Sequence, residues 1–331
     1  MDHIAFKNKV FLCASKLDRE ALALELFRWQ AIHVRPYRDF LHYLHIDPAG
    51  VHDTSRIPYM PVKFFKSHNV LADGYSPSTI FTSSGTSGQT PSRHGVVVES
   101  IYRESYMAAF RLFYGNPSDY VIFALLPAYL ERSGSSLVTM AQGLIEESEH
   151  PDSGFFLNEY SALRELLINH RTSNRKILLL GVSFALLDLA EQHPVQLPHN
   201  AVVMETGGMK GRRRELIRSE LHQRLSKGLG TQNIHSEYGM TELLSQSYAL
   251  SGGKFHCPPW MNIQLRDTED PLSTAPQGKT GGINIMDLAN IHSCAFIATQ
   301  DLGRQFPDGS FEVLGRFDDA EIRGCNLMVA N

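Results

Sequence analysis

The amino-acid sequence predicts an α/β protein in which mostly parallel sheets are flanked by helices, with a β-rich region after them. The first observation is an alternation of short apolar strand patterns with helical patterns: 120–126 (strand), 136–146 (helix), 159–170 (helix), 177–180 (strand), 201–204 (strand) and 213–227 (helix). The second is a change after residue 250, where helical patterns become scarce and strands are expected at 283–286, 294–298 and 311–314. The third is length, because 331 residues exceed the size at which one core stops growing.

These changes divide the chain into three expected parts. Residues 1–56 are expected to form a helical lead-in, 57–250 an α/β core, and 251–331 a β-rich subdomain that ends in a short tail. Within the lead-in, Leu22, Leu26 and Trp29 recur at helical spacing, and Pro36 suits the start of a second helix. No linker separates independent units, so we expect one large domain or tightly joined ones.

The bulk composition excludes several classes of protein. Hydrophobic residues at 43% and charged residues at 20% are typical of a soluble globular protein, and a net charge of −4 argues against a nucleic-acid partner. No apolar stretch reaches the roughly 18 residues of a membrane span, and the first residues lack an apolar run of signal-peptide length, so we expect neither a span nor a signal peptide. Four cysteines without a C-x-x-C pair predict reduced thiols and a cytoplasmic protein. His42 and His45 have no further ligand pair, so we expect no structural zinc site.

A loop rich in Ser, Thr and Gly between Phe81 and His94 is the strongest functional signal. Small hydroxylated residues and glycines let the backbone curl until several N–H groups point one way, and such a concave loop binds phosphate. A Walker A loop requires G-x-x-x-x-G-K-[ST] and a hydrolase nucleophile elbow requires G-x-S-x-G, and neither pattern fits this stretch. The sequence therefore predicts a phosphate loop of a third kind, directly after a strand at 79–81.

Three further motifs follow this loop in a fixed order. The first, residues 237–242, reads E-Y-G-M-T-E and offers an aromatic face, a hydroxyl and a carboxylate close together. The other two are T-Q-D-L-G at 299–303 and G-R-F-D-D at 315–319. Together the four motifs resemble those of the adenylate-forming enzymes, the superfamily of acyl-CoA synthetases, adenylation domains and luciferases. The resemblance implies the fold of the large N-terminal-type domain of these enzymes.

Other runs of sequence resemble the LuxE-type acyl-protein synthetases, the ligase subunit of the bacterial luminescence fatty-acid reductase. They are I-L-L-L-G-V-S-F at 177–184, M-E-T-G-G-M-K-G at 204–211, C-P-P-W at 257–260, D-L-A-N at 287–290 and R-G-C-N-L at 323–327. This resemblance extends from about residue 57 to the end of the chain. It implies an ATP- and Mg²⁺-dependent ligase that activates a carboxylic acid, with a long-chain fatty acid favoured.

The resemblance also implies a role for each candidate site residue. The loop would hold the β- and γ-phosphates, and the Thr86 hydroxyl would lie closest to them. Its phosphate-binding residues would be Ser83, Ser84, Gly85, Thr86, Ser87 and Gly88. Glu242 would bind Mg²⁺, a hard cation that prefers carboxylate oxygens, and Thr241 would donate to the α-phosphate. The remaining nucleotide contacts would be made by Tyr238 (adenine), Gly207 and Gly208 (adenine), Asp301 (ribose hydroxyls) and Arg316 (ribose or phosphate).

The acyl acceptor is expected to be Cys325, which lies six residues from the C-terminus. The luminescence-type synthetases carry an acyl thioester on a cysteine near that end and pass it to a partner protein, an acyl-protein reductase. A thiolate suits this attack because an unperturbed thiol is already a few per cent ionised at neutral pH. Cys13, Cys257 and Cys294 sit in apolar or Pro-rich surroundings and are expected to be inert packing.

The chain departs from the wider superfamily in one respect. Its G-R-F-D-D motif is followed by only twelve residues, so we expect the mobile C-terminal domain of that superfamily, and its lysine, to be absent. Arg93, His94, Lys210 or a partner protein could supply the missing cation. Two other functions stay open: a CoA ligase for an aryl or acyl acid, of the phenylacetate–CoA ligase type, and a nucleotide-binding module without activity.

Overall fold

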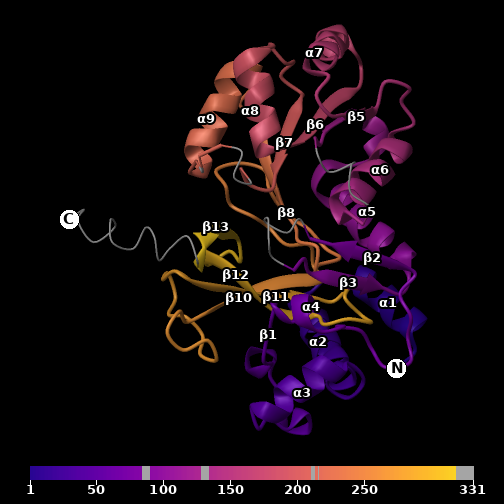
Figure 1. Cartoon of the computed structure of the whole chain (residues 1–331), viewed down its shortest axis with the longest axis vertical. Coiled ribbons are helices and arrows are strands. Elements are labelled where there is room, and N and C mark those ends of the chain that lie inside the picture. The colour runs from indigo at the N-terminus through magenta and orange to yellow at the C-terminus, as the bar shows by residue number, and fades with distance from the viewer. Residues whose placement is uncertain (84–89, 128–133, 210–212, 215, 318–331) are drawn as a thin grey trace, which may run out of the picture.

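The computed structural model describes residues 1–83, 90–127, 134–209, 213–214 and 216–317, and it has the expected α/β class. Figure 1 shows a six-stranded sheet in the upper half, a five-stranded sheet in the lower half, and a short hairpin between them. The helices are α1 (His3–Leu12), α2 (Lys16–His33), α3 (Arg35–Tyr43), α4 (Phe64–Ser67), α5 (Glu99–Tyr114), α6 (Ser136–Ser148), α7 (Tyr160–Asn169), α8 (Ser183–Gln192) and α9 (Arg218–Leu229).

The strands are β1 (Met60–Pro61), β2 (Thr79–Thr82), β3 (Arg93–Val96), β4 (Tyr120–Leu125), β5 (Gly154–Phe156), β6 (Lys176–Val182), β7 (Val202–Thr206), β8 (Ile234–Tyr238), β9 (Ser247–Ala249), β10 (Met261–Arg266), β11 (Gly281–Asp287), β12 (Phe296–Gln305) and β13 (Phe311–Arg316). Several of these strands were expected from the sequence and are confirmed within a few residues. They are the strands expected at 120–126, 177–180, 201–204, 283–286 and 311–314. Single 3₁₀ turns lie at Pro48–Gly50, Thr54–Arg56, Pro117–Asp119 and His170–Thr172.

The six-stranded sheet has the order β5-β4-β6-β7-β8-β9, and all neighbours are parallel except the last pair. Every residue of β4 is buried, as are nearly all of β6, because helices cover both faces of a parallel sheet. In Figure 1, α8 and α9 lie on one side of this sheet and α5 and α6 on the other. The carboxyl ends of β7 and β8 therefore lie next to each other, which is where ligands bind in open parallel sheets.

The five-stranded sheet is organised around β12. Strand β11 runs antiparallel along one edge of β12, while the parallel β1 and the antiparallel β13 share the other edge. The strand expected at 294–298 extends to Gln305, so Asp301 lies within a strand opposite Arg316 and is not a turn residue. A register shift between Leu302 and Gly303 bends the ladder directly after Asp301.

The N-terminal helices pack beneath the five-stranded sheet (Figure 1). Helix α2 begins with a capping box, in which Ser15 and Asp18 satisfy each other's backbone N–H groups. Its buried Gln30 amide donates to the carbonyls of Asn290 and Ile291, at 2.7 and 3.1 Å, and its oxygen accepts from the Ala295 N–H at 2.9 Å. These bonds fasten α2 to the loop between β11 and β12. Among the described residues, no helix is long and apolar enough to cross a membrane.

One predicted helix begins later than its sequence pattern indicated. The pattern predicted a helix at 213–227, but α9 begins at Arg218. Arg213 lies ahead of that helix and forms ion pairs with Asp188 and Glu191 of α8. The predicted start was therefore wrong, and ion pairs with α8 hold Arg213 ahead of the helix.

Candidate functional site

The hairpin β2–β3 closes the base of the Ser/Thr/Gly-rich loop. The Ser83 N–H donates to the Ser92 carbonyl at 3.1 Å, and the Ser92 N–H donates to the Ser83 hydroxyl at 2.8 Å. Gly134 packs against β2 with φ +78°, and a Cβ there would lie 2.7 Å from the Ile80 carbonyl oxygen, so only glycine fits. The predicted phosphate-loop residues Ser84, Gly85, Thr86, Ser87 and Gly88 lie outside the described residues, but both ends of their loop are placed.

Glu242 is buried beside this loop. The residue is only 5% exposed, and the Ser92 side chain lies near its carboxylate. Burial raises the pKa of Glu242 above its ordinary value, and the Ser92 hydroxyl opposes that rise in part. A buried carboxylate held at high pKa gains free energy from a nearby cation, so the residue fits a hard divalent ion. Thr241, one residue earlier, is half-buried.

Asp287 holds the segment that carries Thr241 and Glu242. At the end of β11, its buried carboxylate accepts from the N–H groups of Leu244 and Ser245, at 2.8 and 2.9 Å, and from the Ser245 hydroxyl at 2.6 Å. The Trp260 indole N–H also donates to the Ser245 hydroxyl, at 2.9 Å. The D-L-A-N and C-P-P-W runs thus support the turn after Glu242.

Tyr238 and Asp301 join the two sheets. The Tyr238 hydroxyl, at the carboxyl end of β8, donates to Asp301 Oδ2 on β12 at 2.7 Å. Burial raises the pKa of Asp301, whereas Tyr238, Arg316 and Arg266 lower it in part. Arg316 Nε lies 4.0 Å from Asp301 Oδ1, with its side chain 58% exposed. The predicted adenine, ribose and phosphate residues therefore lie side by side, although they are far apart in sequence.

Gly207 and Gly208 follow the carboxyl end of β7, and both are exposed. Gly207 has φ +66°, a conformation that favours glycine, and the Ser183 hydroxyl donates to its carbonyl at 3.0 Å. Because Thr206 pairs with Glu237 across β7 and β8, Gly207 lies next to Tyr238. The backbone is open here, as the predicted approach of a base requires.

Two buried carboxylates at this edge of the sheet lie in runs named in the sequence analysis, but no role was predicted for them. Glu205 accepts from the Ser236 hydroxyl at 2.5 Å and lies 3.4 Å from Arg218 Nε. Burial alone would raise the pKa of Glu205, but His222, Arg218 and Ser236 hold it below its ordinary value. Glu237 accepts from the Thr206 hydroxyl, and burial raises its pKa to about 7. The signals that could have found them were their places in the runs 204–211 and 237–242 and at the ends of two apolar strands.

The residues that could supply a catalytic positive charge differ in burial and in charge. His94 is 1% exposed, and burial lowers its pKa to about 4, so it is neutral at pH 7 and does not supply a positive charge. Arg93 is exposed on β3 opposite Thr82. Lys210 lies outside the described residues.

The described cysteines are protonated thiols. Burial raises the pKa of Cys257 and of Cys294 to about 12, and it also raises the pKa of Cys13. These three residues are poor nucleophiles at neutral pH, as expected of inert packing. Cys325, the expected acyl acceptor, lies outside the described residues.

A group of potential metal ligands lies elsewhere in the described chain. His150, Asp152 and His170 have candidate ligand atoms within 4.8 Å of one another, and His170 Nε2 lies 2.9 Å from Asp152 Oδ2. The group is near the edge strand β5, whereas Glu242 follows β8. It is not part of the site around Glu242.

Comparison with solved structures shows the class to which this architecture belongs. A 2-hydroxyisobutyryl-CoA ligase in complex with 2-HIB-AMP and CoA is 13% identical, with a TM-score of 0.66 over 92% of this chain and 71% of that chain. ATP-bound MatB from Rhodopseudomonas palustris is 17% identical, with a TM-score of 0.52 over 72% of this chain and 47% of that chain. The O-succinylbenzoate coenzyme A synthetase MenE from Bacillus subtilis, in complex with AMP, is 18% identical, with a TM-score of 0.50 over 74% and 50%. At these identities the likeness shows the fold, which is that of the adenylate-forming ligases.

The family follows from the sequence itself. The profile of the family described as "Acyl-protein synthetase, LuxE" matches residues 149–331, more than half of the chain. The chain belongs to the LuxE acyl-protein synthetase family. A comparison with curated protein sequences finds no match.

Proposed function

We propose that this protein activates a carboxylic acid with ATP and Mg²⁺ and passes the acyl group through an enzyme thioester to a partner protein. The observation that carries the proposal is the hydrogen bond between Tyr238 and Asp301, which joins the second and third predicted nucleotide motifs. The Ser92 side chain lies near the buried carboxylate of Glu242, which supports the proposal because it brings one end of the Ser/Thr/Gly-rich loop close to the second motif.

Residues of the predicted motifs would each meet one part of ATP. Adenylation brings a carboxylate to the α-phosphate, so two anions meet and the barrier is mainly electrostatic. The loop from Ser83 would hold the β- and γ-phosphates through backbone N–H groups, and Thr241 would donate to the α-phosphate. Mg²⁺, held by Glu242, would neutralise phosphate charge. Asp301 and Arg316 would hold the ribose, and Tyr238 would stack on the adenine next to Gly207 and Gly208.

Two substitutions complete the proposed reaction. In the first, a carboxylate oxygen of the acid bonds to the α-phosphorus as the bond to pyrophosphate breaks, which yields acyl-AMP. In the second, the Cys325 thiolate bonds to the acyl carbon as AMP leaves, and the acyl group passes from there to an acyl-protein reductase. The thiol proton goes to solvent or to a nearby base.

A long-chain fatty acid is the proposed substrate. Each buried methylene is worth about 0.8 kcal/mol, so ten methylenes in an apolar tunnel could supply roughly 8 kcal/mol. In this proposal residues 57–250 bind the nucleotide and the acyl group, after the helical lead-in of residues 1–56. Residues 251–331 contribute Asp301, Arg316 and the cysteine.

The activity is tested by acid-dependent exchange of labelled pyrophosphate into ATP, with a panel of fatty and aryl acids. We expect exchange with at least one long-chain acid, because adenylation is reversible before thiol attack. If no acid supports exchange, with or without the partner reductase, the chain is a nucleotide-binding module without activity. Rapid formation of free acyl-CoA would instead favour a CoA ligase, an activity for which the solved relatives are named.

Removing the Asp301 carboxylate is expected to weaken ATP binding by roughly 30- to 150-fold. Loss of a charged hydrogen bond to the ribose corresponds to about 2–3 kcal/mol. The measurement is calorimetric titration of Asp301→Ala with ATP and Mg²⁺, alongside its thermal unfolding. Tyr238→Phe is the matched control, since it removes the hydroxyl that binds Asp301 and keeps the ring. Equal losses of affinity in both variants would mean that Asp301 only orients Tyr238, and unchanged affinity in Asp301→Ala would exclude a ribose contact.

A further inference from the structure

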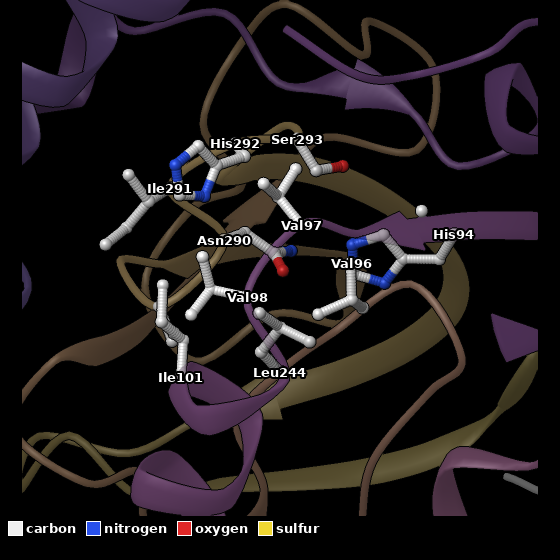
Figure 2. Close-up of a pocket in the computed structure, with 12 residues that line it drawn as sticks. His94, Val96, Val97, Val98, Ile101, Leu244, Asn290, Ile291, His292 and Ser293 are labelled. Carbon is white, nitrogen blue, oxygen red and sulfur yellow. The ribbon is translucent and has the colours of Figure 1, made fainter. Parts of the chain in front are cut away.

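A small pocket is lined by His94 and Asn290 (Figure 2), which also contact the backbone carbonyls of Thr241 and Glu242. It is bordered by β3 and the chain after it, by the first turn of α5, by Leu244, and by residues 289–293 between β11 and β12. Its volume of about 10 Å³ is near the smallest that holds one water molecule. The pocket lies apart from Tyr238 and Asp301, neither of which lines it.

The walls of this pocket are mostly apolar, but two polar atoms in them have no partner among the described residues. Val96, Val98 and Leu244 supply apolar surface. The orphan atoms are Nε2 of His94 and Oδ1 of Asn290, in side chains that are 1% and 0% exposed. A buried polar atom without a hydrogen bond costs about 1–3 kcal/mol, so each atom calls for a ligand.

The hydrogen-bonding role of His94 Nε2 follows from its other ring nitrogen. His94 Nδ1 lies 2.9 Å from the Thr241 carbonyl oxygen, which only accepts, so Nδ1 carries the proton. Burial lowers the pKa of His94 to about 4, although the hydrogen bond to Thr241 partly offsets this lowering. The ring is therefore neutral at pH 7. Nε2 is therefore a lone-pair acceptor.

Asn290, like His94, presents a hydrogen-bond acceptor to the pocket. Its Nδ2 donates to the Glu242 carbonyl at 2.8 Å and to the Cys294 carbonyl at 3.2 Å, which fixes the orientation of the amide. Its Oδ1 is then an acceptor at the pocket. His94 and Asn290 thus donate to the carbonyls of two consecutive residues, Thr241 and Glu242, and both present acceptors to one small space.

A ligand for this pocket must donate hydrogen bonds and be about the size of water. A cation is disfavoured, because no aspartate or glutamate lines the pocket to balance its charge. A water molecule has two O–H donors and matches two acceptors. We infer that the pocket holds one buried water between His94 Nε2 and Asn290 Oδ1, and that the two side chains, through their donors to the Thr241 and Glu242 carbonyls, fix the Thr241–Glu242 segment. The effect on catalysis rests on the function proposed above.

The water itself is tested by a crystal structure at a resolution that shows ordered solvent. We expect one water at about 2.7–3.2 Å from both His94 Nε2 and Asn290 Oδ1. An empty pocket, or a rotated amide that places Asn290 Nδ2 toward His94, would overturn the inference. This result does not depend on activity, so it stands even if no acid supports pyrophosphate exchange.

A pair of His94 variants separates its two contacts. Asn at position 94 keeps a donor near Nδ1 and removes the acceptor, whereas Gln places its amide near Nε2 and removes the donor to Thr241. We expect His94→Gln to raise the Mg²⁺ concentration for half-maximal exchange by roughly 10- to 100-fold, as for residues that orient metal ligands. His94→Asn should stay within about threefold of the wild type in that measurement, and its crystal structure should lack the water.

Equal Mg²⁺ dependence in His94→Gln and His94→Asn would contradict a positioning role for His94. A fall in thermal stability alone, with unchanged Mg²⁺ dependence in both variants, would reduce His94 to a packing residue. Pyrophosphate exchange by the wild-type protein is measured alongside the variants. If the proposed function fails, the wild type itself shows no exchange, and that result is distinct from a failure of the positioning role.

Discussion

Glu242→Gln is expected to lower the rate of acid-dependent pyrophosphate exchange on the order of 100-fold. The substitution keeps the volume of the side chain but removes the charge that would hold Mg²⁺, and a lost electrostatic contact to a transition state has about this effect. The residue is 5% exposed, so solvent screens its charge little. Exchange rates at saturating ATP over a range of Mg²⁺ concentrations measure the change.

Glu237→Gln is the matched control for this experiment. Glu237 is also buried, lies five positions earlier, and burial raises its pKa to about 7, so its carboxyl is already partly protonated at neutral pH. We expect it to lose no more than a few-fold in exchange. Similar losses in both variants would show that any buried carboxylate here supports only the fold, and Glu242 would no longer be a metal ligand.

Cys325→Ser is expected to abolish the covalent acyl adduct completely, or to leave a slower-forming ester. Wild-type protein incubated with ATP, Mg²⁺ and a suitable acid should gain the mass of the acid minus water. Neutral hydroxylamine should remove that mass, because thioesters react with it readily. Pyrophosphate exchange should survive in the variant, since adenylation precedes attack by the thiol. Intact-mass analysis and the exchange assay, run on the same samples, measure both effects.

The other cysteines provide the comparison. Cys13→Ser and Cys257→Ser should change neither the adduct nor exchange, because burial raises the pKa of each of these thiols. A label on any residue other than Cys325, or free acyl-CoA formed normally by Cys325→Ser, would remove the thioester step. The CoA-ligase interpretation would then be the better one.

The parallel sheet was predictable because its strands are short continuous apolar runs between helical patterns. β4 and β6 appear within two residues of their expected bounds, since burial on both faces demands such runs. The start of α9 was not predictable from propensity, because Arg213 is a good helix former, yet it lies ahead of the helix and pairs with carboxylates of α8. The end of β12 was missed for a similar reason. Its polar residues 299–301 interrupt the apolar pattern, and the strand continues through them because Asp301 pairs with Arg316 of β13 and Leu302 with Gly282 of β11.

The candidate site was predictable as a set of residues but not as a geometry. Tyr238 and Asp301 are 63 positions apart, and no local pattern shows that they share a hydrogen bond. Asp287 and Asn290 were visible as polar residues in a run that resembles the family, yet their partners lie on the turn after Glu242. His94 was considered as a source of positive charge, which its burial excludes.

The bonds of Gln30 have a consequence for synthesis of the chain. Their partners lie 260 or more positions later. At roughly 5–20 residues per second, the ribosome completes them roughly 13–50 s after Gln30. Throughout translation of the intervening segment, the Gln30 amide has none of these three partners in the nascent chain. Helix α2 can pack early against its neighbours in sequence, but the Gln30 amide is among the last groups to reach its native hydrogen bonds, and chaperones have their longest opportunity to bind there.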